Sequence, residues 1–461
     1  MARNMWAKPG PAVWWRRYST VASVLQWTPG MTTTARRLDV AQPARDVAAP
    51  VRSAVPGWDA LLICIGVYVA AAVGRIHDLF PVLLLFKPAL TAGVLAICLY
   101  LLQRSRERRM PLRSHAATYL IGLVVWAALT VPGALNQGTA FQAWTELART
   151  VAMSFVIAAS VRTARDVERV AVVYFGVTVV YAAVVLSRFQ LGADTWRLGR
   201  LYYYDANDMA TLIVTAMPLG LYFVLGQRRL VVRAFALAGL AALAVCLIRS
   251  GSRGGLLAFL FVAAFVLLRV TTIPARSRLA GLVLILVILA ATASDQYWAQ
   301  MQTIVHPKQD YNLTSEEGRL KVWTRGIAYI ADEPVFGVGV NNFHVAEGTI
   351  SPLARLQEHG IGVRWGAAHN SYIQVASELG IPGFLLFMGV LWTAFASLRR
   401  VARRGRGVPT DDASRLAQSL LAALVGFVVG AFFLSLAYTD MLYTLVAMSL
   451  GLAKTARRNG V

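Results

Sequence analysis

The sequence is poor in charged residues, in acidic residues and in cysteine. Only 15% of its 461 residues are charged, whereas soluble globular domains have about 25%. Just 23 are Asp or Glu, against 45 Lys and Arg, which gives a formal net charge of +22. The three cysteines all stand in apolar runs, so neither a disulfide framework nor a zinc site can be recognised. These shortages argue against a soluble globular protein.

The sequence is instead rich in long apolar segments. Hydrophobic residues make up 57% of the chain, and its mean hydropathy is +0.56. From Trp58 onward, apolar segments of about 16 to 24 residues recur, close to the roughly 20 needed to cross a bilayer. We therefore expect an all-α polytopic membrane protein with about twelve transmembrane helices. The approximate spans are 58–74, 79–102, 116–135, 141–161, 167–187, 209–226, 231–248, 254–270, 279–294, 371–398, 416–437 and 439–454.

The spans divide the chain into five parts. A cytoplasmic tail, 1–57, precedes helices one to nine in 58–293, and a long, partly helical outer loop domain occupies 294–370. Helices ten to twelve follow in 371–454, and 455–461 forms a second cytoplasmic tail. The N-terminal tail holds no apolar run long enough to span, and its Trp and Arg residues suit contact with anionic lipid.

Arginine placement predicts the orientation of the spans. Short basic connections follow every second span, as cytoplasmic loops should, and both tails fall on the same side. Most of the positive charge is thus loop charge in contact with membrane lipid, and it does not indicate a nucleic-acid partner. The five basic connections are "QRSRERRMPLRS", "VRTARDVER", "GQRRLVVR", "RVTTIPARSR" and "RRVARRGRG".

Several basic residues break this rule because they fall in outward connections. For any one of them, snorkelling or simple solvation in a loop is the alternative explanation. As a group, they indicate an anion site at the outer face. They are Arg197 and Arg200 in "DTWRLGRLYYYDANDMA", Arg249 and Arg253 in "IRSGSRGGLL", and Arg319, Lys321 and Arg325 in "SEEGRLKVWTRG".

The connection "RSGSRGG" has the chemistry of an anion site. Its glycines allow a ligand close to the backbone, and the helix that follows offers free N–H groups. Guanidinium groups bind phosphate oxygens in pairs, so several arginines together suggest the diphosphate of a lipid-linked sugar. The alternative is a plain turn of small residues.

His369 stands at the outer mouth of the tenth predicted span, in "WGAAHNSYIQVASELGIPGFLLF". A neutral imidazole there can accept a proton from a hydroxyl and act as general base; the alternative is an interfacial polar residue without chemistry. Asn370 or Ser371 can cap the helix that follows, and Asn370 is also a candidate substrate contact.

Glu378 lies further along the same span, beside the expected kink "GIPG". Nine residues at 1.5 Å each place it about 13 Å from His369, at membrane depth. An intramembrane carboxylate is a functional candidate. The alternative is an ion pair with a buried partner such as Lys87.

Together these segments resemble a known family. "SGSRGG", "GRLKVW", "DEPVFGVGVNNF" and "HNSYIQVASELGIPG", in this order, are similar to the O-antigen ligase and polymerase superfamily of bacterial envelope glycosyltransferases. The resemblance implies a metal-independent enzyme that moves a glycan from undecaprenyl diphosphate to an acceptor hydroxyl on the periplasmic face of the inner membrane. Family motif positions fall on Arg253, Arg319 and His369, and also on Arg200, Arg249 and Asn207.

Within the superfamily, the ligase transfers O-antigen to the lipid A-core of lipopolysaccharide, whereas the polymerase joins repeat units. The single long outer loop and the end of the sequence about seven residues after the last span favour the ligase. A polymerase or another oligosaccharyltransferase of the superfamily is the alternative.

The expected mechanism joins the residues to the resemblance. His369 deprotonates the acceptor hydroxyl, while Arg253, Arg319 and Arg200 hold the departing diphosphate, and in-line attack inverts the anomeric centre. Lys321 and Arg325 add positive charge nearby. The outward acidic residues considered, among them Asp205 and Asp208, form no D-x-D pair, so neither a metal nor another cofactor is expected.

A transporter or flippase of lipid-linked saccharides is an alternative from another class. It would also place arginines in a cavity between helices. Two features count against it: no internal repeat is visible, and a loop of about 75 residues is long for gating alone.

Overall fold

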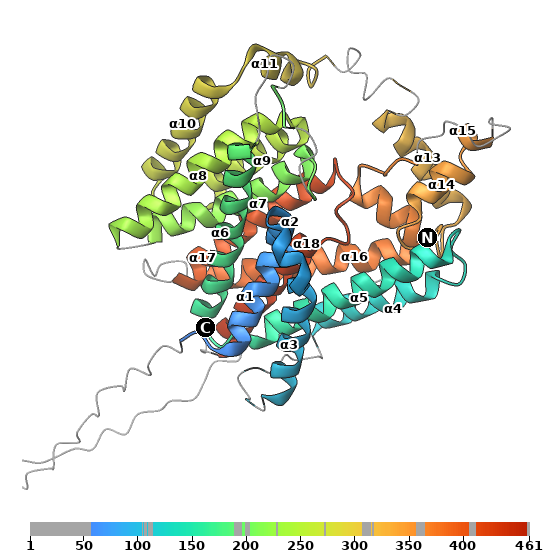
Figure 1. Cartoon of the computed structure of the whole chain (residues 1–461), viewed down its shortest axis with the longest axis horizontal. Coiled ribbons are helices and arrows are strands. Elements are labelled where there is room, and N and C mark those ends of the chain that lie inside the picture. The colour runs from blue at the N-terminus through green and yellow to red at the C-terminus, as the bar shows by residue number, and fades with distance from the viewer. Residues whose placement is uncertain are drawn as a thin grey trace, which may run out of the picture. The chain divides into compact units, whose positions relative to one another are not determined.

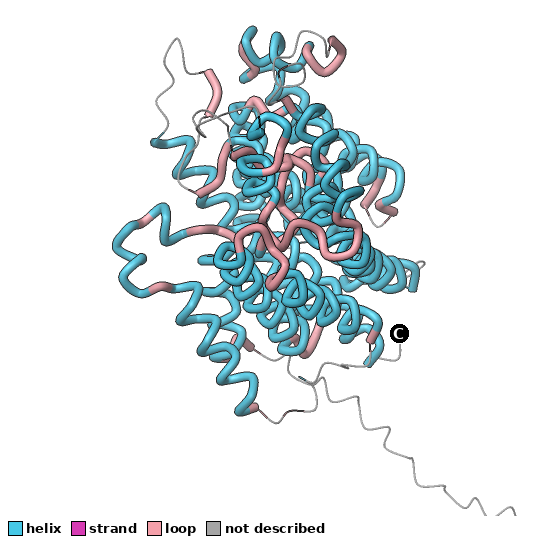
Figure 2. Tube along the Cα trace, turned by 90° about the vertical axis from the view of Figure 1, so that its right-hand side faces the viewer, coloured by secondary structure: helices cyan, strands magenta, loops and turns pink. Residues whose placement is uncertain are grey.

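The computed structural model describes residues 57–458 apart from short gaps at 104, 106–107, 109–113, 189–195, 199–202, 227–228, 272, 307–314, 316–317, 356–364 and 405–411. Within these ranges every regular element is a helix, and Figure 2 draws only helices and connecting loops. The all-helical prediction is confirmed for this part of the chain.

Each of the twelve predicted spans contains a helix. They are α1 (Ala60–Ala72), α3 (Pro88–Leu102), α4 (His115–Thr130), α5 (Gln137–Ser160), α6 (Ala164–Arg188), α7 (Ala206–Gly226), α8 (Leu230–Ser250), α9 (Arg253–Arg269), α10 (Ala275–Thr292), α16 (Ser371–Arg404), α17 (Asp412–Ala431) and α18 (Asp440–Arg458). Two short elements, α2 (Ile76–Leu79) and the 3₁₀-helix η1 (Pro81–Phe86), join α1 to α3.

Seven helical segments of the described part are long and apolar enough to cross a membrane. They are Pro81–Leu102, α6, α7, α8, α10, α16 and α17. Two further apolar helices, α1 and α4, are shorter: the 13 residues of α1 extend over about 20 Å, less than a hydrocarbon core of roughly 30 Å. The chain is therefore a multi-pass membrane protein, and the number twelve stays a prediction.

Helices α7 and α17 lie side by side in the interior of the bundle. α7 also packs against α8, α9 and α6, while α16 packs against α4, α17 and α18. Both central helices bury many aliphatic side chains, and Gly426 and Gly430 of α17 lie against Val214 and Thr211 of α7. α10 is peripheral, because it contacts only α8 and α9 closely and no residue of it is buried (Figure 1).

Small polar residues fix where several helices begin. A side-chain oxygen there accepts an N–H from the first turn, a donor that has no partner inside the helix. These caps are Asp59 for α1, Ser114 for α4, Asn136 for α5, Ser252 for α9 and Ser294 for α11 (Asp295–Gln302).

The interval between α10 and α16 is partly helical, as expected. Besides α11 it holds α13 (Arg319–Asp332), α14 (Phe343–Thr349) and α15 (Pro352–Arg355). α13 and α14 pack against α16, and both lie near its N-terminal half in Figure 1. The side of the membrane on which this interval lies stays a prediction.

α16 is broken in its first half, at Gly380, which has φ 67° and ψ −175°. The break leaves backbone groups without helical partners, and residues 334–339 supply them. Val338 N–H donates to Ser377 O at 2.9 Å, Gly339 N–H donates to Glu378 O at 3.0 Å, and Ile381 N–H donates to Pro334 O at 2.8 Å. The kink expected at "GIPG" is therefore a true interruption of the helix.

Two glycines allow this close backbone contact. A Cβ atom on Gly380 would lie 2.1 Å from Val335 O, and one on Gly337 would lie 2.4 Å from Ser377 O. Both residues also have positive φ, a backbone conformation that residues with a side chain rarely adopt. The glycines of "VFGVGV" and "GIPG" are thus required by the packing of one backbone segment on another.

Candidate active site

The α6–α7 and α8–α9 connections are joined by hydrogen bonds. Arg197 Nε donates to Ser250 O at 2.8 Å, and its Nη2 donates to Asn207 Oδ1 at 3.3 Å. Leu198 N–H donates to Arg249 O at 2.9 Å. The structure thus brings Arg249 and Asn207, two of the predicted site residues, beside Arg197 at the end of the bundle where α9 begins.

Arg253 is the first residue of α9, directly after the cap Ser252. Its Nη1 donates to Thr303 Oγ1 at 2.5 Å, just after the end of α11. Arg253 is therefore held between the start of α9 and the segment after α11, close to the positive end of the α9 dipole.

Arg197 and Arg253 influence each other electrostatically. Burial lowers the pKa of the Arg197 guanidinium, the nearby Asp205 carboxylate opposes this change, and Arg253 lowers the pKa further. Asp205 also caps α7, since its Oδ1 accepts N–H groups from Asn207 at 2.7 Å and Asp208 at 2.8 Å. An anion bound here would relieve the repulsion between the two guanidinium groups.

Gly251 explains part of the "RSGSRGG" pattern. It has φ 57°, and a Cβ atom would lie 2.9 Å from the Trp196 ring and 3.0 Å from the Arg197 side chain. A side chain at this position would displace Arg197 from its contacts with Ser250 and Asn207. The glycine is thus needed for the arrangement of the arginines.

His369 adopts a left-handed backbone conformation, with φ 47°, directly before α16. Its N–H donates to Ser435 Oγ at 3.0 Å, and the residue is half-buried. Residues other than glycine seldom adopt this conformation, although histidine tolerates it better than most. The position of the imidazole thus depends on residues far along the chain.

Asn370 caps α16, as expected, because its Oδ1 accepts the N–H groups of Tyr372 at 2.9 Å and Ile373 at 3.1 Å. Ser371 Oγ donates to Leu434 O at 2.7 Å and accepts from Leu436 N at 2.8 Å. These bonds fix the helix start beside His369 to the connection between α17 and α18.

The same connection, residues 432–439, links His369 to the arginines. Phe433 lies against Gly254, next to Arg253, since a Cβ atom on Gly254 would lie 3.1 Å from Phe433 Cβ. Phe432 contacts Trp323 with ring centroids 5.4 Å apart, and Trp323 Nε1 donates to Ala368 O at 3.0 Å. Sequence reasoning missed this connection because "FFLSLA" reads as the end of a span.

α13 carries Arg319 and Lys321 in its first turn, and Lys321 is exposed. Arg325, one turn later, is paired with Glu347 of α14: Nε lies 2.9 and 3.0 Å from the two carboxylate oxygens, and Nη2 lies 2.5 Å from Oε2. Tyr329 OH donates to the same carboxylate at 2.8 Å, and Glu347 is only 3% exposed. This buried pair fixes α13 on α14.

Glu378 does not pair with Lys87, so that expectation is wrong. Its Oε2 accepts the N–H of Asn341 at 3.0 Å, and its Oε1 accepts that of Phe343 at 3.2 Å, so it holds the "GVNNF" segment against α16. Lys87 lies exposed at the end of η1 instead. Sequence patterns give little indication of these contacts, because both Asn341 and Phe343 bind Glu378 through their backbone N–H groups.

Arg75 is a further basic residue at this end that the sequence reasoning missed. Its guanidinium lies 3.2 Å from the centre of the Tyr203 ring, and Tyr204 OH donates to Val73 O at 2.9 Å. Arg75 falls in an outward connection by the same alternation that singled out the other arginines, so the signal was present. Arg200 lies outside the described residues.

No group of three or more His, Cys, Asp or Glu side chains lies close enough to hold a metal ion in the part of the chain that the structure describes. The side chains gathered near His369 and Arg253 are mainly cations, amides, hydroxyls and aromatic rings, with the carboxylate of Asp205 beside Arg197. Such groups suit an anionic or sugar-containing ligand.

The helices and this group of residues define a multi-pass membrane protein with basic side chains and a histidine at one set of helix connections. The sequence profile of the family described as O-antigen ligase matches residues 238–388, which include Arg249, Arg253, Arg319 and His369. This part of the chain belongs to the O-antigen ligase superfamily, so the resemblance is confirmed. A comparison with curated proteins finds no match.

The family matched by residues 238–388 implies a glycosyltransferase-like activity on a lipid-linked glycan. Arg197 and Asn207 lie outside the matched segment, but Arg197 connects both to it through its hydrogen bonds with Asn207 and with Ser250.

Proposed function

We propose that the protein is an O-antigen ligase of the bacterial inner membrane. In this role it transfers O-antigen glycan from undecaprenyl diphosphate to the lipid A-core oligosaccharide at the periplasmic face, during lipopolysaccharide biosynthesis. One observation carries the proposal: the α17–α18 connection contacts both His369 and the start of α9, where Arg253 lies near Arg197. A proton acceptor and a diphosphate site are thereby joined through one segment.

In the proposed reaction, neutral His369 takes the proton of the acceptor hydroxyl as its oxygen attacks the anomeric carbon. The new glycosidic bond forms while the bond from the anomeric carbon to the diphosphate oxygen breaks, and the electron pair leaves with the diphosphate. Attack opposite the leaving group inverts the anomeric centre. Arg253, with Arg319 and Arg200, stabilises the charge that develops on the leaving group.

We propose that Lys321 and Arg249 add to the positive field, and that Asn207 and Asn370 help to position substrate and base. Arg325 contributes through its pair with Glu347, which fixes α13 and thus Arg319. The proposed chemistry needs no metal ion, because guanidinium groups neutralise the diphosphate.

The test is transfer by the purified protein in lipid nanodiscs. The protein is given a defined undecaprenyl-diphosphate glycan with and without lipid A-core, and the products are separated and the new glycosidic bond is located. A ligase extends lipid A-core only. Extension of the donor glycan without lipid A-core would identify a polymerase, and unchanged covalent structure with donor moved across a vesicle membrane would identify a flippase. Either result would refute the proposal.

A further inference from the structure

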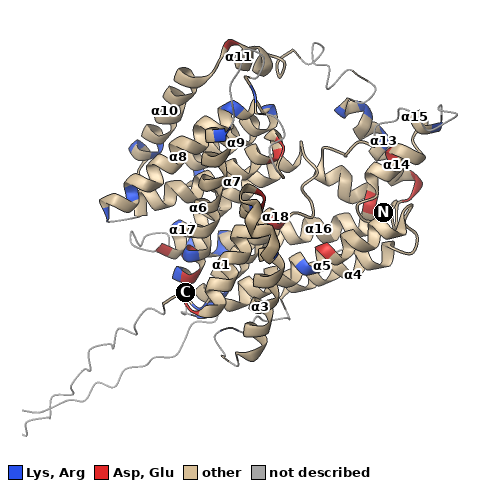
Figure 3. Ribbon diagram, viewed as in Figure 1, with Lys and Arg blue, Asp and Glu red and all other residues tan. Residues whose placement is uncertain are grey.

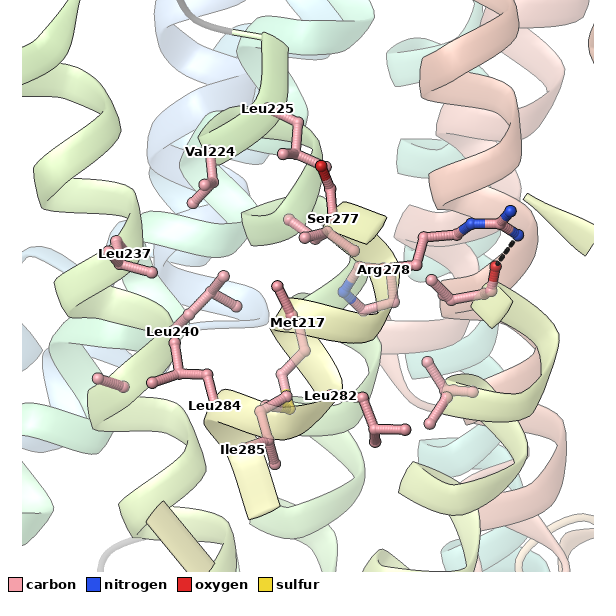
Figure 4. A pocket seen from close by; sticks show the side chains of 18 of the residues that line it. Met217, Val224, Leu225, Leu237, Leu240, Ser277, Arg278, Leu282, Leu284 and Ile285 are labelled. Carbon is pink, nitrogen blue, oxygen red and sulfur yellow. Dashed lines mark hydrogen bonds between the residues drawn. The ribbon is translucent and has the colours of Figure 1, made fainter. Parts of the chain in front are cut away.

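A cavity of about 340 Å³ lies between α7, α8, α9 and α10. Among the described residues, its wall is hydrocarbon except for three polar side chains, Arg233, Ser277 and Arg278, and includes no acidic residue. In Figure 4, Ser277 and Arg278 lie toward one end of the cavity, while Leu284 and Ile285 lie toward the other. The cavity therefore has a polar rim and an apolar interior.

The rim lies where α8 and α10 begin. Arg233 is in the first turn of α8 and Arg278 in the first turn of α10, and the wall extends from them to Ala241 and Ile288. These are eight and ten residues further along, which corresponds to about 12 to 15 Å. That length is about half of a hydrocarbon core of roughly 30 Å, so the cavity matches one leaflet.

The lipid side of the cavity is formed by the peripheral helix α10. None of the 18 residues of α10 is buried, although the helix is apolar enough to span. A chain of hydrocarbon in the cavity would give α10 the packing contacts that the neighbouring helices do not supply. An unfilled apolar space of this size would forfeit those contacts.

The rim is suited to an anion. Arg278 Nη1 donates to Val266 O at 3.2 Å and also to Leu267 O, but its Nε is buried and has no partner among the described residues. Arg233 is exposed at the other side of the rim. Figure 3 shows further basic residues at the end of the bundle where α8 and α10 begin.

We propose that this cavity binds one acyl chain of an anionic glycerophospholipid, whose phosphate lies between Arg233 and Arg278. The lipid belongs to the leaflet on the side of these two residues, which the positive-inside rule predicts to be cytoplasmic. The choice of a phospholipid over the donor lipid rests on the proposed diphosphate site near Arg253, whereas lipid binding itself does not require the transfer reaction.

An ordinary phospholipid fits this place better than the polyprenyl tail of a donor. Arg233 and Arg249 lie near opposite ends of α8, 16 residues apart, which is about 24 Å along the helix axis. A donor whose diphosphate is held near Arg253 would therefore present no phosphate to the rim. An anion bound between the rim arginines would therefore be a group separate from the donor diphosphate.

The experiment measures lipid retained by the purified, delipidated protein in native mass spectrometry. Phosphatidylglycerol and phosphatidylcholine with identical acyl chains are titrated separately. We expect one phosphatidylglycerol to be retained preferentially, and Arg233→Gln and Arg278→Gln each to weaken its binding about fivefold, or about 1 kcal/mol per basic residue. Arg276→Gln, at an exposed arginine outside the cavity wall, should leave binding unchanged.

A second set of variants fills the cavity. Gly281 lines it, and a Cβ atom there would have no heavy atom within 4 Å, so Gly281→Phe should fold and exclude the acyl chain. Ala241→Phe narrows the cavity from α8 and should give the same loss. Gly176→Phe, at an equally open glycine of α6 outside the cavity, is the matched control.

Three results would overturn the proposal. These are equal retention of phosphatidylcholine, unchanged phosphatidylglycerol binding in both cavity-filling variants, and displacement of phosphatidylglycerol by an equimolar polyprenyl phosphate. Because the readout is bound lipid, failure here leaves the glycan-transfer proposal intact, and loss of transfer in another variant does not affect this one.

Discussion

The backbone N–H of His369 donates a 3.0 Å hydrogen bond to the Ser435 hydroxyl, which connects the start of α16 to the α17–α18 connection. Residues in left-handed conformations persist where surrounding contacts fix them, and they concentrate at functional sites. Here Ser435 and the neighbouring Ser371 bonds supply such contacts. The position of the imidazole is therefore set by two segments that are distant in sequence.

His369→Ala is expected to lower kcat about 10²- to 10⁴-fold, the usual contribution of a general acid or base, with little change in unfolding temperature. Initial rates of glycan transfer at saturating donor check this. His115→Ala, at an exposed histidine that begins α4, is the control and should be silent. Equal losses in both variants would mean that the histidine has no special role in transfer.

Ser435→Ala should reduce kcat by a smaller factor, about two- to tenfold, because it removes one hydrogen bond worth about 0.5 to 1.5 kcal/mol. Ser187→Ala, at an exposed serine of α6, provides the matched control.

Arg253→Lys is expected to reduce transfer although it keeps the charge, because an ammonium group cannot make two parallel N–H bonds to phosphate oxygens. The loss should appear mainly in kcat if the contact strengthens as the diphosphate departs. Arg276→Lys is the control.

The unmodified protein should retain full transfer activity in the presence of EDTA. Strong inhibition that Mg²⁺ reverses, with Arg253→Lys active, would contradict the proposed chemistry.

Arg325→Gln is expected to destabilise the protein by about 3 to 5 kcal/mol, because it leaves the buried Glu347 carboxylate without its positively charged partner. The double variant Arg325→Met with Glu347→Leu should recover much of the unfolding temperature. Separating Arg149 from Glu146, an exposed pair 3.9 Å apart, should cost at most about 1 kcal/mol. An Arg325→Gln protein of normal stability that has lost donor binding would instead identify Arg325 as a substrate contact.

Gly380→Ala should lower the unfolding temperature strongly. The backbone conformation alone costs about 1 to 3 kcal/mol for a residue with a side chain, and the new Cβ atom would meet Val335 O. Gly281→Ala, at an open site in α10, should instead be neutral or slightly stabilising. Tryptophan fluorescence during heating in detergent measures both, and an unchanged Gly380→Ala protein would show that the break can close.

Reporter fusions test the orientation of the helices. Fusions at Arg108, Arg229 and Arg403 should report cytoplasm because their connections are basic. Fusions at Asp205, Ser252 and Asn341 should report periplasm. A cytoplasmic signal at Ser252 would remove the basis for treating Arg253 as an exception to the positive-inside rule.

Hydropathy predicts the helical segments well, because the bilayer demands about 20 apolar residues whatever their neighbours. Local signals also predict the cap at Asn370 and the break near Pro382. The contacts of Glu378 with Asn341 and Phe343 were not predictable, because they are made by backbone N–H groups. The pairing of Arg325 with Glu347 was likewise not predictable from their spacing, because the two residues are 22 positions apart on separate helices.

The break in α16 has a consequence for the order in which the chain is made. Trp126 Nε1 donates to Leu379 O at 2.8 Å, and residues 334–339 make the hydrogen bonds to Ser377, Glu378 and Ile381. All of these partners precede Gly380 in the sequence, so they leave the ribosome before it. Carbonyl groups exposed to lipid without a partner cost several kcal/mol each. A circularly permuted chain that began at α16 would have to insert the broken helix before its partners existed, and we expect its insertion to be inefficient.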